Sequence, residues 1–321
     1  MFAVYANSAN PTDPLASLVV GERPEPESKT GWQRVEVKAA SLNHHDIWSL
    51  RGVGLASDQL PMILGCDASG IDESGREVLV HAIIGDAAWT GAETQDPKRS
   101  LLSEKYQGTF AQFVLVPDRN LIVKPAEMSF AQAAALPTSW LTAYSALASK
   151  SGLKPGDTVL IQGAGGGVST ALTVLAHAMG FRTWVTTRDL AKRERSLSLG
   201  ADEVFESGTR LPARVDAVME TVGQATWAHS VRALRPGGTI VISGATSGDS
   251  PPAELTRIFF LELKVIGSTM GSKVELESLL QFMVKNNLEP VIDQILPMDK
   301  ALAGFEKMIA GNVFGKVIFT L

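Results

Sequence analysis

The clearest chemical signal in the sequence is a glycine-rich segment at residues 163–167, which follows the apolar run Thr158–Ile161. Glycine permits a tight turn and lets the backbone approach a ligand closely. When a helix follows, its first N–H groups and its dipole favour an anion. A strand, such a turn and a helix in succession predict the pyrophosphate site of a dinucleotide cofactor; the alternative is a glycine-rich loop without a ligand. Ser169 stands where the usual fingerprint has its third glycine. The predicted contacts are Ala164, Gly166, Gly167 and Val168.

Polar and basic residues follow the next predicted strand, 183–186. An acidic side chain usually meets the ribose hydroxyls of NAD at this point. Here Arg188 can pair with a phosphate through its planar guanidinium, and Lys192 adds a point charge one helical turn later. Together with Thr187 they predict NADPH, bound through its 2′-phosphate. Two alternatives stay open: the cations are solvated residues at a helix start, or Asp189 contacts a ribose.

A second group of chemically capable side chains lies at residues 43–48. Asn43 could hydrogen bond to a cofactor or an acceptor oxygen, or could simply be a turn residue. His44 or its neighbour His45 could supply a proton, because histidine titrates near neutral pH. Asp46 is predicted to support its neighbours by hydrogen bonding, and Trp48 could pack in the core. The predicted catalytic residues are Asn43, His44 and Asp46.

The single cysteine, Cys66, excludes an intramolecular disulfide and a four-thiolate zinc site. His44, His45, Cys66 and Asp67 are residue types that bind metals. Adjacent residues of a strand point to opposite faces, however, so two adjacent pairs rarely converge on one ion. We therefore predict no metal site. Cys66 is expected to be a small core residue, because the sequence shows no charged partner for it.

The composition excludes several functional classes. Hydrophobic residues make up 45% and charged residues 20% of the 321-residue chain, as in globular proteins. The net charge of −5 and the lack of a basic block argue against nucleic acid as a partner. The sequence contains no uninterrupted apolar run of about 18 residues, so it predicts no membrane span. The first residues do not resemble a secretory signal. We expect a cytoplasmic protein.

The elements that must position these residues change character along the chain. Up to about residue 125, short strands alternate with glycine and proline, which predicts a mostly β domain. From about residue 129, strands alternate with helices, which predicts a doubly wound parallel sheet. The final strand, 316–319, should rejoin the first domain, with Lys316 solvated. The predicted α/β fold has one domain at 1–125 and 271–321 and another at 126–270.

Further cofactor contacts are expected near carboxyl ends of strands, at Ser243, Gly244, Ala245 and Met270.

Several segments together resemble the medium-chain dehydrogenase/reductase superfamily over nearly the whole chain. The resemblance implies a GroES-like domain that contains both chain ends and a Rossmann domain inserted between them. It also implies a homodimer formed through edge strands such as 263–267. It places Thr142 near the nicotinamide, and Trp48 resembles a substrate-pocket aromatic of the quinone reductases in the family. The segments that carry it are 42–48, 65–70, 108–113, 133–147, 163–169, 267–271 and 314–318.

The sequence differs from the zinc-dependent members of this superfamily at the positions of their zinc ligands, and these differences indicate the chemistry. Their zinc ligands, a cysteine, a histidine and a second cysteine, match Asn43, Cys66 and Thr138 here. Without zinc, an electron-poor acceptor is easier to reduce than an alcohol is to oxidise. The chain is most similar to the zinc-independent quinone oxidoreductase branch, which implies NADPH-dependent reduction of a quinone or an activated C=C bond. The alternatives are an alcohol dehydrogenase with an unusual metal site and a non-catalytic NADPH-binding sensor.

Overall fold

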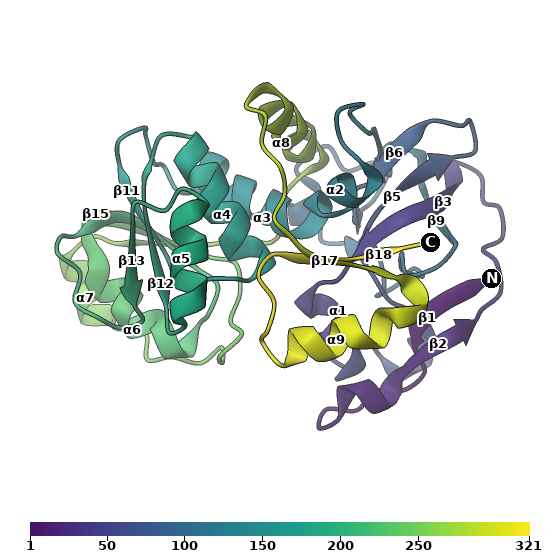
Figure 1. Ribbon diagram of the computed structural model, residues 1–321, viewed down its shortest axis with the longest axis horizontal. Helices are drawn as coiled ribbons and strands as arrows, with labels where there is room; N and C mark the ends of the chain where they lie inside the picture. Colours follow the sequence, from purple (N-terminus) through teal and green to yellow (C-terminus); the bar gives the residue numbers. More distant parts are fainter. The chain divides into compact units, whose positions relative to one another are not determined.

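The computed structural model describes residues 1–321 and divides into two compact units (Figure 1). Unit 1 comprises Met1–Ser139 and Ser272–Leu321, and unit 2 comprises Trp140–Gly271. The α/β fold class is confirmed, with mostly antiparallel sheets in unit 1 and a parallel sheet in unit 2. No helix is both long and apolar enough to cross a bilayer.

The first boundary between the units lies later than the predicted one at residue 125. Helix α2 (Phe130–Ala134) is capped by Ser129, whose hydroxyl accepts a hydrogen bond from the Gln132 amide at 3.2 Å. Its buried alanines pack against Ala39 and Ile318 of the unit 1 sheet. This packing places α2 with unit 1 rather than with the segment that follows.

Unit 1 is built around a seven-stranded sheet with the order β10-β6-β5-β3-β18-β17, in which β9 also pairs with β3. A three-stranded sheet, β2-β1-β4, and the pair β7-β8 complete it. The strands are β1 (Phe2–Ala6), β2 (Leu18–Glu22), β3 (Trp32–Ser41), β4 (Met62–Ile63), β5 (Asp67–Asp72), β6 (Glu77–Val80), β7 (Ile83–Ile84), β8 (Ser100–Leu101), β9 (Phe113–Pro117), β10 (Leu121–Val123), β17 (Ile292–Pro297) and β18 (Lys316–Thr320).

The carboxyl-terminal strand β18 returns to the amino-terminal part of the chain, as predicted. It pairs antiparallel with β3, with Ile318 opposite Ser41, and parallel with β17. Figure 1 shows it, in yellow, within the sheet of purple and blue strands. Phe319 packs edge-on against Phe110 in the core beneath. The remaining helices of unit 1 are α1 (His44–Leu50), α8 (Lys273–Lys285) and α9 (Ala301–Ile309).

Unit 2 contains a six-stranded parallel sheet with the order β13-β12-β11-β14-β15-β16. This is the doubly wound order, in which the chain reverses direction across the sheet between β11 and β14. Continuous apolar strands suit a sheet covered on both faces, and Val159, Leu160 and Ile161 of β11 are all fully buried. The strands are β11 (Thr158–Ile161), β12 (Arg182–Thr187), β13 (Glu203–Glu206), β14 (Val215–Glu220), β15 (Leu234–Ile242) and β16 (Lys264–Gly267).

The helices of unit 2 follow the strands as the periodicity predicted. Helix α4 buries Ala171, Leu172 and Leu175 on one face and packs against β11 and β12. The helical segment before β11 is irregular: π-helical turns lie at Leu136–Trp140 and Ser145–Lys150 on either side of α3. The helices are α3 (Leu141–Tyr144), α4 (Gly167–Ala178), α5 (Leu190–Ser198), α6 (Gln224–Ala233) and α7 (Leu255–Phe260).

Candidate functional site

The predicted catalytic residues of unit 1 lie at the start of helix α1. Asn43 precedes the helix, and its backbone N–H donates to Asp46 Oδ2 at 2.8 Å. The other oxygen, Asp46 Oδ1, accepts from the Gly65 N–H at 2.8 Å, and the carboxyl is fully buried. Burial raises the pKa of Asp46 to about 6. Asp46 therefore ties the first turn of α1 to the loop before β5, which is the supporting role expected for it.

A buried lysine lies next to Asn43. The Lys316 side chain on β18 is 2% exposed, so the prediction of a solvated lysine was wrong. Its Nζ donates to Asn43 Oδ1 at 2.6 Å and to the Leu42 carbonyl at 2.8 Å, and lies 3.5 Å from Asp67 Oδ2. Burial lowers the pKa of Lys316, against the attraction of Asp67 and Asp46. The sequence does not indicate the contact between Lys316 and Asn43, because the two residues are about 270 positions apart.

The Asp67 carboxylate accepts hydrogen bonds from three other side chains near Lys316. Its Oδ2 accepts from Ser41 Oγ at 2.7 Å and from Asn43 Nδ2 at 2.9 Å, and its Oδ1 accepts from the Thr138 hydroxyl. Both ends of the Asn43 amide are thus occupied by the protein. We call Ser41, Asn43, Asp67, Thr138 and Lys316 the lysine cluster.

The lysine cluster does not fit the zinc ion that the zinc-dependent members of the resembled family bind. Of the three matched positions, Asn43 and Thr138 offer an amide and a hydroxyl, both already bonded to Asp67. Asn43 Oδ1 also accepts from the Lys316 ammonium group. This positive charge lies where a metal ion would bind and would repel it. Zinc sites use thiolate, imidazole or carboxylate ligands, and only Cys66 among the three supplies one.

A different group of donors surrounds His45. The assumption that His44 and His45 lie on a strand was wrong, because α1 is a helix. The four residues His44, His45, Cys66 and Asp67 still do not form one group, since His44 is exposed and Asp67 belongs to the lysine cluster. His45 Nδ1 lies 3.4 Å from Cys66 Sγ and 3.4 Å from Ser103 Oγ, and Nε2 lies 3.1 Å from Glu104 Oε1. Cys66 therefore has the partner that the sequence did not reveal. Ser103 has a φ of 65°, uncommon for a residue other than glycine.

The two neighbouring histidines differ in protonation. Burial opposes a charge on His45, but Cys66, Glu104 and Asp46 raise the pKa of His45 well above its ordinary value. Burial raises the pKa of the Cys66 thiol, against the influence of His45. Desolvation, together with the positive charges of Lys316 and Arg51, lowers the pKa of His44. His45 thus favours the charged form and His44 the neutral one.

The exposed face of α1 carries His44 and Trp48. These residues are four positions apart, so they share one side of the helix, and both are exposed. Trp48, at 36% exposure, is therefore available to a ligand and is not a core residue. Ile47 and Leu50, on the opposite side, are buried in the core of unit 1.

In unit 2, the glycine-rich turn follows β11 at the edge where the parallel strands end. Gly163 and Gly165 have φ of 83° and 94°, which only glycine adopts without strain. Helix α4 begins at Gly167, and no side chain caps its first amides. Ser169 donates its hydroxyl to the Gly166 carbonyl at 3.1 Å, so a serine is accommodated there. These features fit a pyrophosphate group, which amides at a helix start can bind.

Other predicted cofactor residues follow the ends of neighbouring strands. Thr187 ends β12, and Arg188 follows it, exposed. Asp189 caps α5 by accepting from the Ala191 N–H at 2.8 Å. Lys192 lies in the first turn of that helix.

The loops after β15 and β16 hold the next predicted residues. Ser243 follows β15, and a Cβ on Gly244 would lie 2.9 Å from the Thr221 carbonyl oxygen, so no larger residue fits. Met270 follows β16, is buried and has a φ of 45°. Thr142 is buried in α3.

Buried polar side chains that the sequence did not indicate hold this edge together. Gln162, fully buried, accepts from Thr186 Oγ1 at 2.8 Å and donates to Ser230 Oγ at 3.0 Å. Glu220, fully buried at the end of β14, accepts from Ser230 Oγ at 2.6 Å and from the Gly223 N–H at 3.0 Å. The sequence could have indicated Gln162 and Glu220 as polar residues at strand ends. It could not indicate their hydrogen-bond partners, which are distant in sequence.

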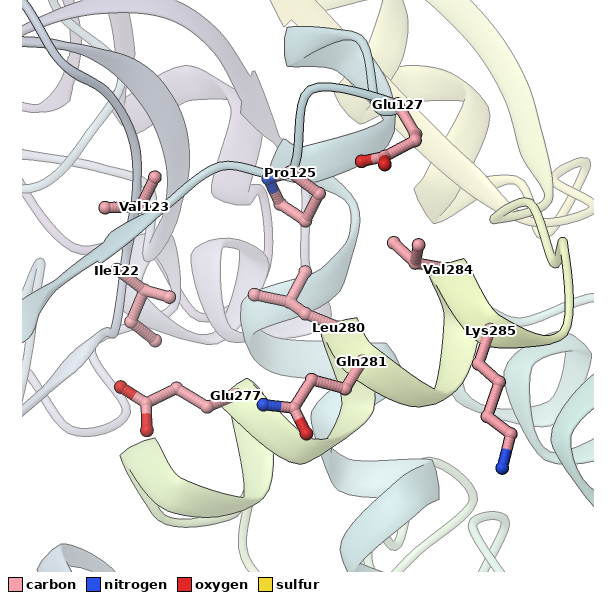
Figure 2. A pocket seen from close by; sticks show the side chains of 9 residues that line it. All are labelled: Ile122, Val123, Pro125, Glu127, Glu277, Leu280, Gln281, Val284 and Lys285. Atoms are coloured by element: carbon pink, nitrogen blue, oxygen red, sulfur yellow. The ribbon is translucent and has the colours of Figure 1, made fainter.

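A groove of about 430 Å³ in unit 1 lies apart from the predicted site residues. Figure 2 shows side chains of helix α8, among them Leu280 and Val284, facing Ile122 and Pro125 from the segment around β10. None of the predicted catalytic residues lines it. Titratable side chains of Glu127, Glu277 and Lys285 lie beside its apolar walls, but no predicted site residue does, so we place the chemistry elsewhere.

Comparisons with known proteins agree with the fold. Residues 29–126 match the alcohol dehydrogenase GroES-like domain, and residues 167–285 match the zinc-binding dehydrogenase family. A 2-methylene-furan-3-one reductase from Solanum lycopersicum is 29% identical over 301 residues, covering 91% of this chain and 72% of the relative. A zinc-type alcohol dehydrogenase-like protein from Schizosaccharomyces pombe is 30% identical over 266 residues, covering 81% and 77% of the two chains.

Solved structures give the same result. The crystal structure of an NAD-dependent alcohol dehydrogenase aligns with a TM-score of 0.92 and 32% identity over the full length of both chains. The two domain matches, these relatives and the doubly wound order of unit 2 agree with the family that the motifs resembled. The chain is an oxidoreductase of the medium-chain dehydrogenase/reductase superfamily.

Proposed function

We propose that this protein transfers hydride from NADPH to a quinone or to a C=C bond conjugated with a carbonyl group, without a catalytic zinc ion. The observation that carries the proposal is the lysine cluster, where Asn43 and Thr138 bond to Asp67 and the Lys316 ammonium holds Asn43. Electron-poor acceptors need no Lewis acid as strong as zinc. The relative from Solanum lycopersicum, a 2-methylene-furan-3-one reductase, supports the choice of acceptor.

The cofactor would lie at the carboxyl edge of the unit 2 sheet. The uncapped first amides of α4 and the turn at residues 163–167 would hold the pyrophosphate. Arg188 and Lys192 would hold the 2′-phosphate, because a guanidinium pairs with two phosphate oxygens at once. We assign further contacts to Thr142, Ala164, Gly166, Gly167, Val168, Thr187, Ser243, Gly244, Ala245 and Met270.

When bound, NADPH supplies the hydride. Addition of hydride to the β-carbon of an enone moves the π electrons onto the carbonyl oxygen, and the product then takes one proton at the α-carbon. We assign this proton to His44, an exposed side chain that favours the neutral form and would relay a proton taken up from water. Trp48, on the same face of α1, would contact the acceptor. Asn43 and Asp46 act as positioning residues, since they hold the first turn of this helix.

We also propose a homodimer formed through β16, the edge strand of the unit 2 sheet. Val265 on this strand is 44% exposed, and Phe259 and Phe260 are exposed in the helix just before it. Light scattering that gives only the monomer mass would contradict the dimer. The cytoplasmic location belongs to the same proposal and rests on the single cysteine.

The test uses protein dialysed against a chelator, so that metal content is known. NADPH and NADH are titrated by fluorescence, and then an enone and a quinone are added while cofactor absorbance is followed. We expect oxidation of NADPH without added metal. Arg188→Ala should weaken NADPH binding about 10- to 100-fold, the range for a hydrogen bond to a charged group, and leave NADH binding unchanged. Arg193→Ala, which removes an exposed cation on α5, the helix that follows Arg188, is the matched control.

Three outcomes discriminate between the functions. Turnover of either acceptor in the metal-free protein supports the proposal. Tight NADPH binding without turnover of any acceptor favours a sensor. Preference for NADH, with activity only after zinc is added, identifies an alcohol dehydrogenase and contradicts the proposal.

A further inference from the structure

We propose that His45, Asp46 and Cys66, with the Ser103 hydroxyl as a fourth donor, form a metal-binding site for one borderline divalent cation such as Zn²⁺, separate from the positions of the family's catalytic zinc. The donor atoms of His45, Asp46 and Cys66 lie within 4.8 Å of one another, and Ser103 Oγ lies 3.4 Å from His45 Nδ1 and 3.7 Å from Cys66 Sγ. Helix α1, the residue before β5 and the loop after β8 bring them together. We call them the His45 site.

The distances within the His45 site suit ligands of a single tetrahedral ion. Zinc bonds of about 2.3 Å to sulfur and about 2.0–2.2 Å to nitrogen or oxygen place neighbouring ligands about 3.4–3.6 Å apart. Here Nδ1 and Sγ are 3.4 Å apart, Nδ1 and Oγ 3.4 Å, and Sγ and Oγ 3.7 Å. The separation of His45 Nδ1 and Ser103 Oγ is long for a hydrogen bond, but it matches two ligands of one ion.

The second ring nitrogen of His45 has the partner that metal-binding histidines usually have. Nε2 lies 3.1 Å from Glu104 Oε1, and Glu104 Oε2 accepts from the Leu101 N–H at 3.1 Å. A carboxylate on one ring nitrogen keeps the proton there and turns the lone pair of the other nitrogen toward the ion. Glu104 thus orients His45 Nδ1 toward Cys66 and Ser103.

All four donors come from the protein, and backbone hydrogen bonds hold the Asp46 carboxylate in place. Its two oxygens accept from the N–H groups of Asn43 and Gly65, both at 2.8 Å. The Leu102 carbonyl oxygen accepts from the Cys66 thiol at 3.3 Å. Cys66 and Ser103 are buried, at 1% and 0% exposure. A site filled by protein donors leaves no open position for a substrate, as in structural metal sites. Its ion would secure the start of α1 and would not act as the Lewis acid of the reaction.

The His45 site shares only Cys66 with the three family positions. Asn43 and Thr138 do not belong to it, because both are bonded to Asp67 in the lysine cluster. Lys316 is bound to the Leu42 carbonyl and Asn43. The proposal is therefore independent of the proposed reaction: metal-free turnover tests one, and metal binding by the unliganded protein tests the other.

The experiment titrates the chelator-treated full chain with Co²⁺ and, separately, with Zn²⁺ by calorimetry. We expect one ion per chain, a thiolate-to-cobalt charge-transfer band and the visible bands of a tetrahedral ion. Cys66→Ser should abolish the charge-transfer band. His45→Gln should weaken binding at least 100-fold, and His44→Gln, which changes the adjacent histidine, should leave it unchanged. Glu104→Gln should weaken binding about 10- to 100-fold.

Folding is checked independently, by circular dichroism and by thermal unfolding of each variant. Zn²⁺ should raise the melting temperature of the wild type and of His44→Gln, but not that of His45→Gln. The proposal is overturned if the wild type binds no ion, if the cobalt spectrum lacks the thiolate band, or if His45→Gln binds like the wild type. Loss of binding in Thr138→Val with retention in His45→Gln would place the ion at the family position instead.

Discussion

The lysine cluster of unit 1 and the glycine-rich turn of unit 2 are positioned in opposite ways. The turn is a continuous segment, and backbone conformation defines it, with φ of 83° at Gly163 and 94° at Gly165. The lysine cluster joins side chains of β3, β5 and β18 with Asn43 and Thr138, and hydrogen bonds between side chains define it. The first arrangement is encoded locally, and the second exists only in the folded unit. Mutations should therefore break the two in different ways.

The largest effect is expected for Lys316→Met. The change keeps much of the side-chain volume but leaves Asp67 charged and Asn43 Oδ1 without its donor, both buried. Removing one partner of a buried ion pair typically destabilises a protein by about 3–5 kcal/mol. Chemical denaturation measures the free energy of unfolding. Lys300→Met, at an exposed lysine of the same unit, should change it by less than about 0.5 kcal/mol. Equal effects of the two substitutions would show that the buried pair contributes little.

The next effect tests the backbone-defined turn with Gly163→Ala. The alanine would have to keep the left-handed backbone conformation of Gly163, which costs a residue with a Cβ about 1–2 kcal/mol. The added Cβ would lie 3.1 Å from Val222 Cγ2. Gly208→Ala is the matched control, because φ there is 84° and nothing lies within 4 Å of the added Cβ. Both variants should lose similar stability, measured by denaturation. Only Gly163→Ala should weaken NADPH binding, by about tenfold or more. Similar cofactor affinity in both variants would remove the turn from the cofactor site.

The same contrast explains how far the sequence could predict the molecule. In unit 2, strand β11 matched its predicted bounds, because apolar runs and glycines are local signals. Helix α1 was missed, although Asn43 followed by Asp46 three positions later is a pattern of helix starts. No local pattern places Lys316 in the core, since its partners lie in the first third of the chain. The contact of His45 with Cys66 was hidden for the same reason.

A smaller effect separates the two adjacent histidines by pH, in metal-free protein. Cys66, Glu104 and Asp46 raise the folded-state pKa of His45. Its stabilisation is therefore complete below the ordinary value of 6.5 and is lost as pH rises through the folded-state pKa. The pKa of His44 is lowered, so His44 reduces stability as pH falls below 6.5.

Unfolding free energies measured from pH 5 to pH 9 compare the two histidines directly. His45→Gln should flatten the alkaline side of the profile and His44→Gln the acid side, with each tenfold change in proton affinity equivalent to about 1.4 kcal/mol. The same flattening from both substitutions would mean that the histidines titrate as one group.

The smallest effect is expected where the turn departs from the usual fingerprint, at Ser169. The third glycine normally allows the helix to pack closely on the strand, but here the Ser169 hydroxyl donates to the Gly166 carbonyl at 3.1 Å and the side chain is buried. Ser169→Gly removes this bond and adds backbone freedom, so it should reduce stability by about 1 kcal/mol or less. NADPH affinity, measured by fluorescence titration, should change less than threefold, because the amides of the turn keep their positions. Ser169→Ala is the control that removes only the hydroxyl. A large gain in affinity for Ser169→Gly alone would mean that the serine holds the helix away from the cofactor, and the turn would then depend on a side chain as the lysine cluster does.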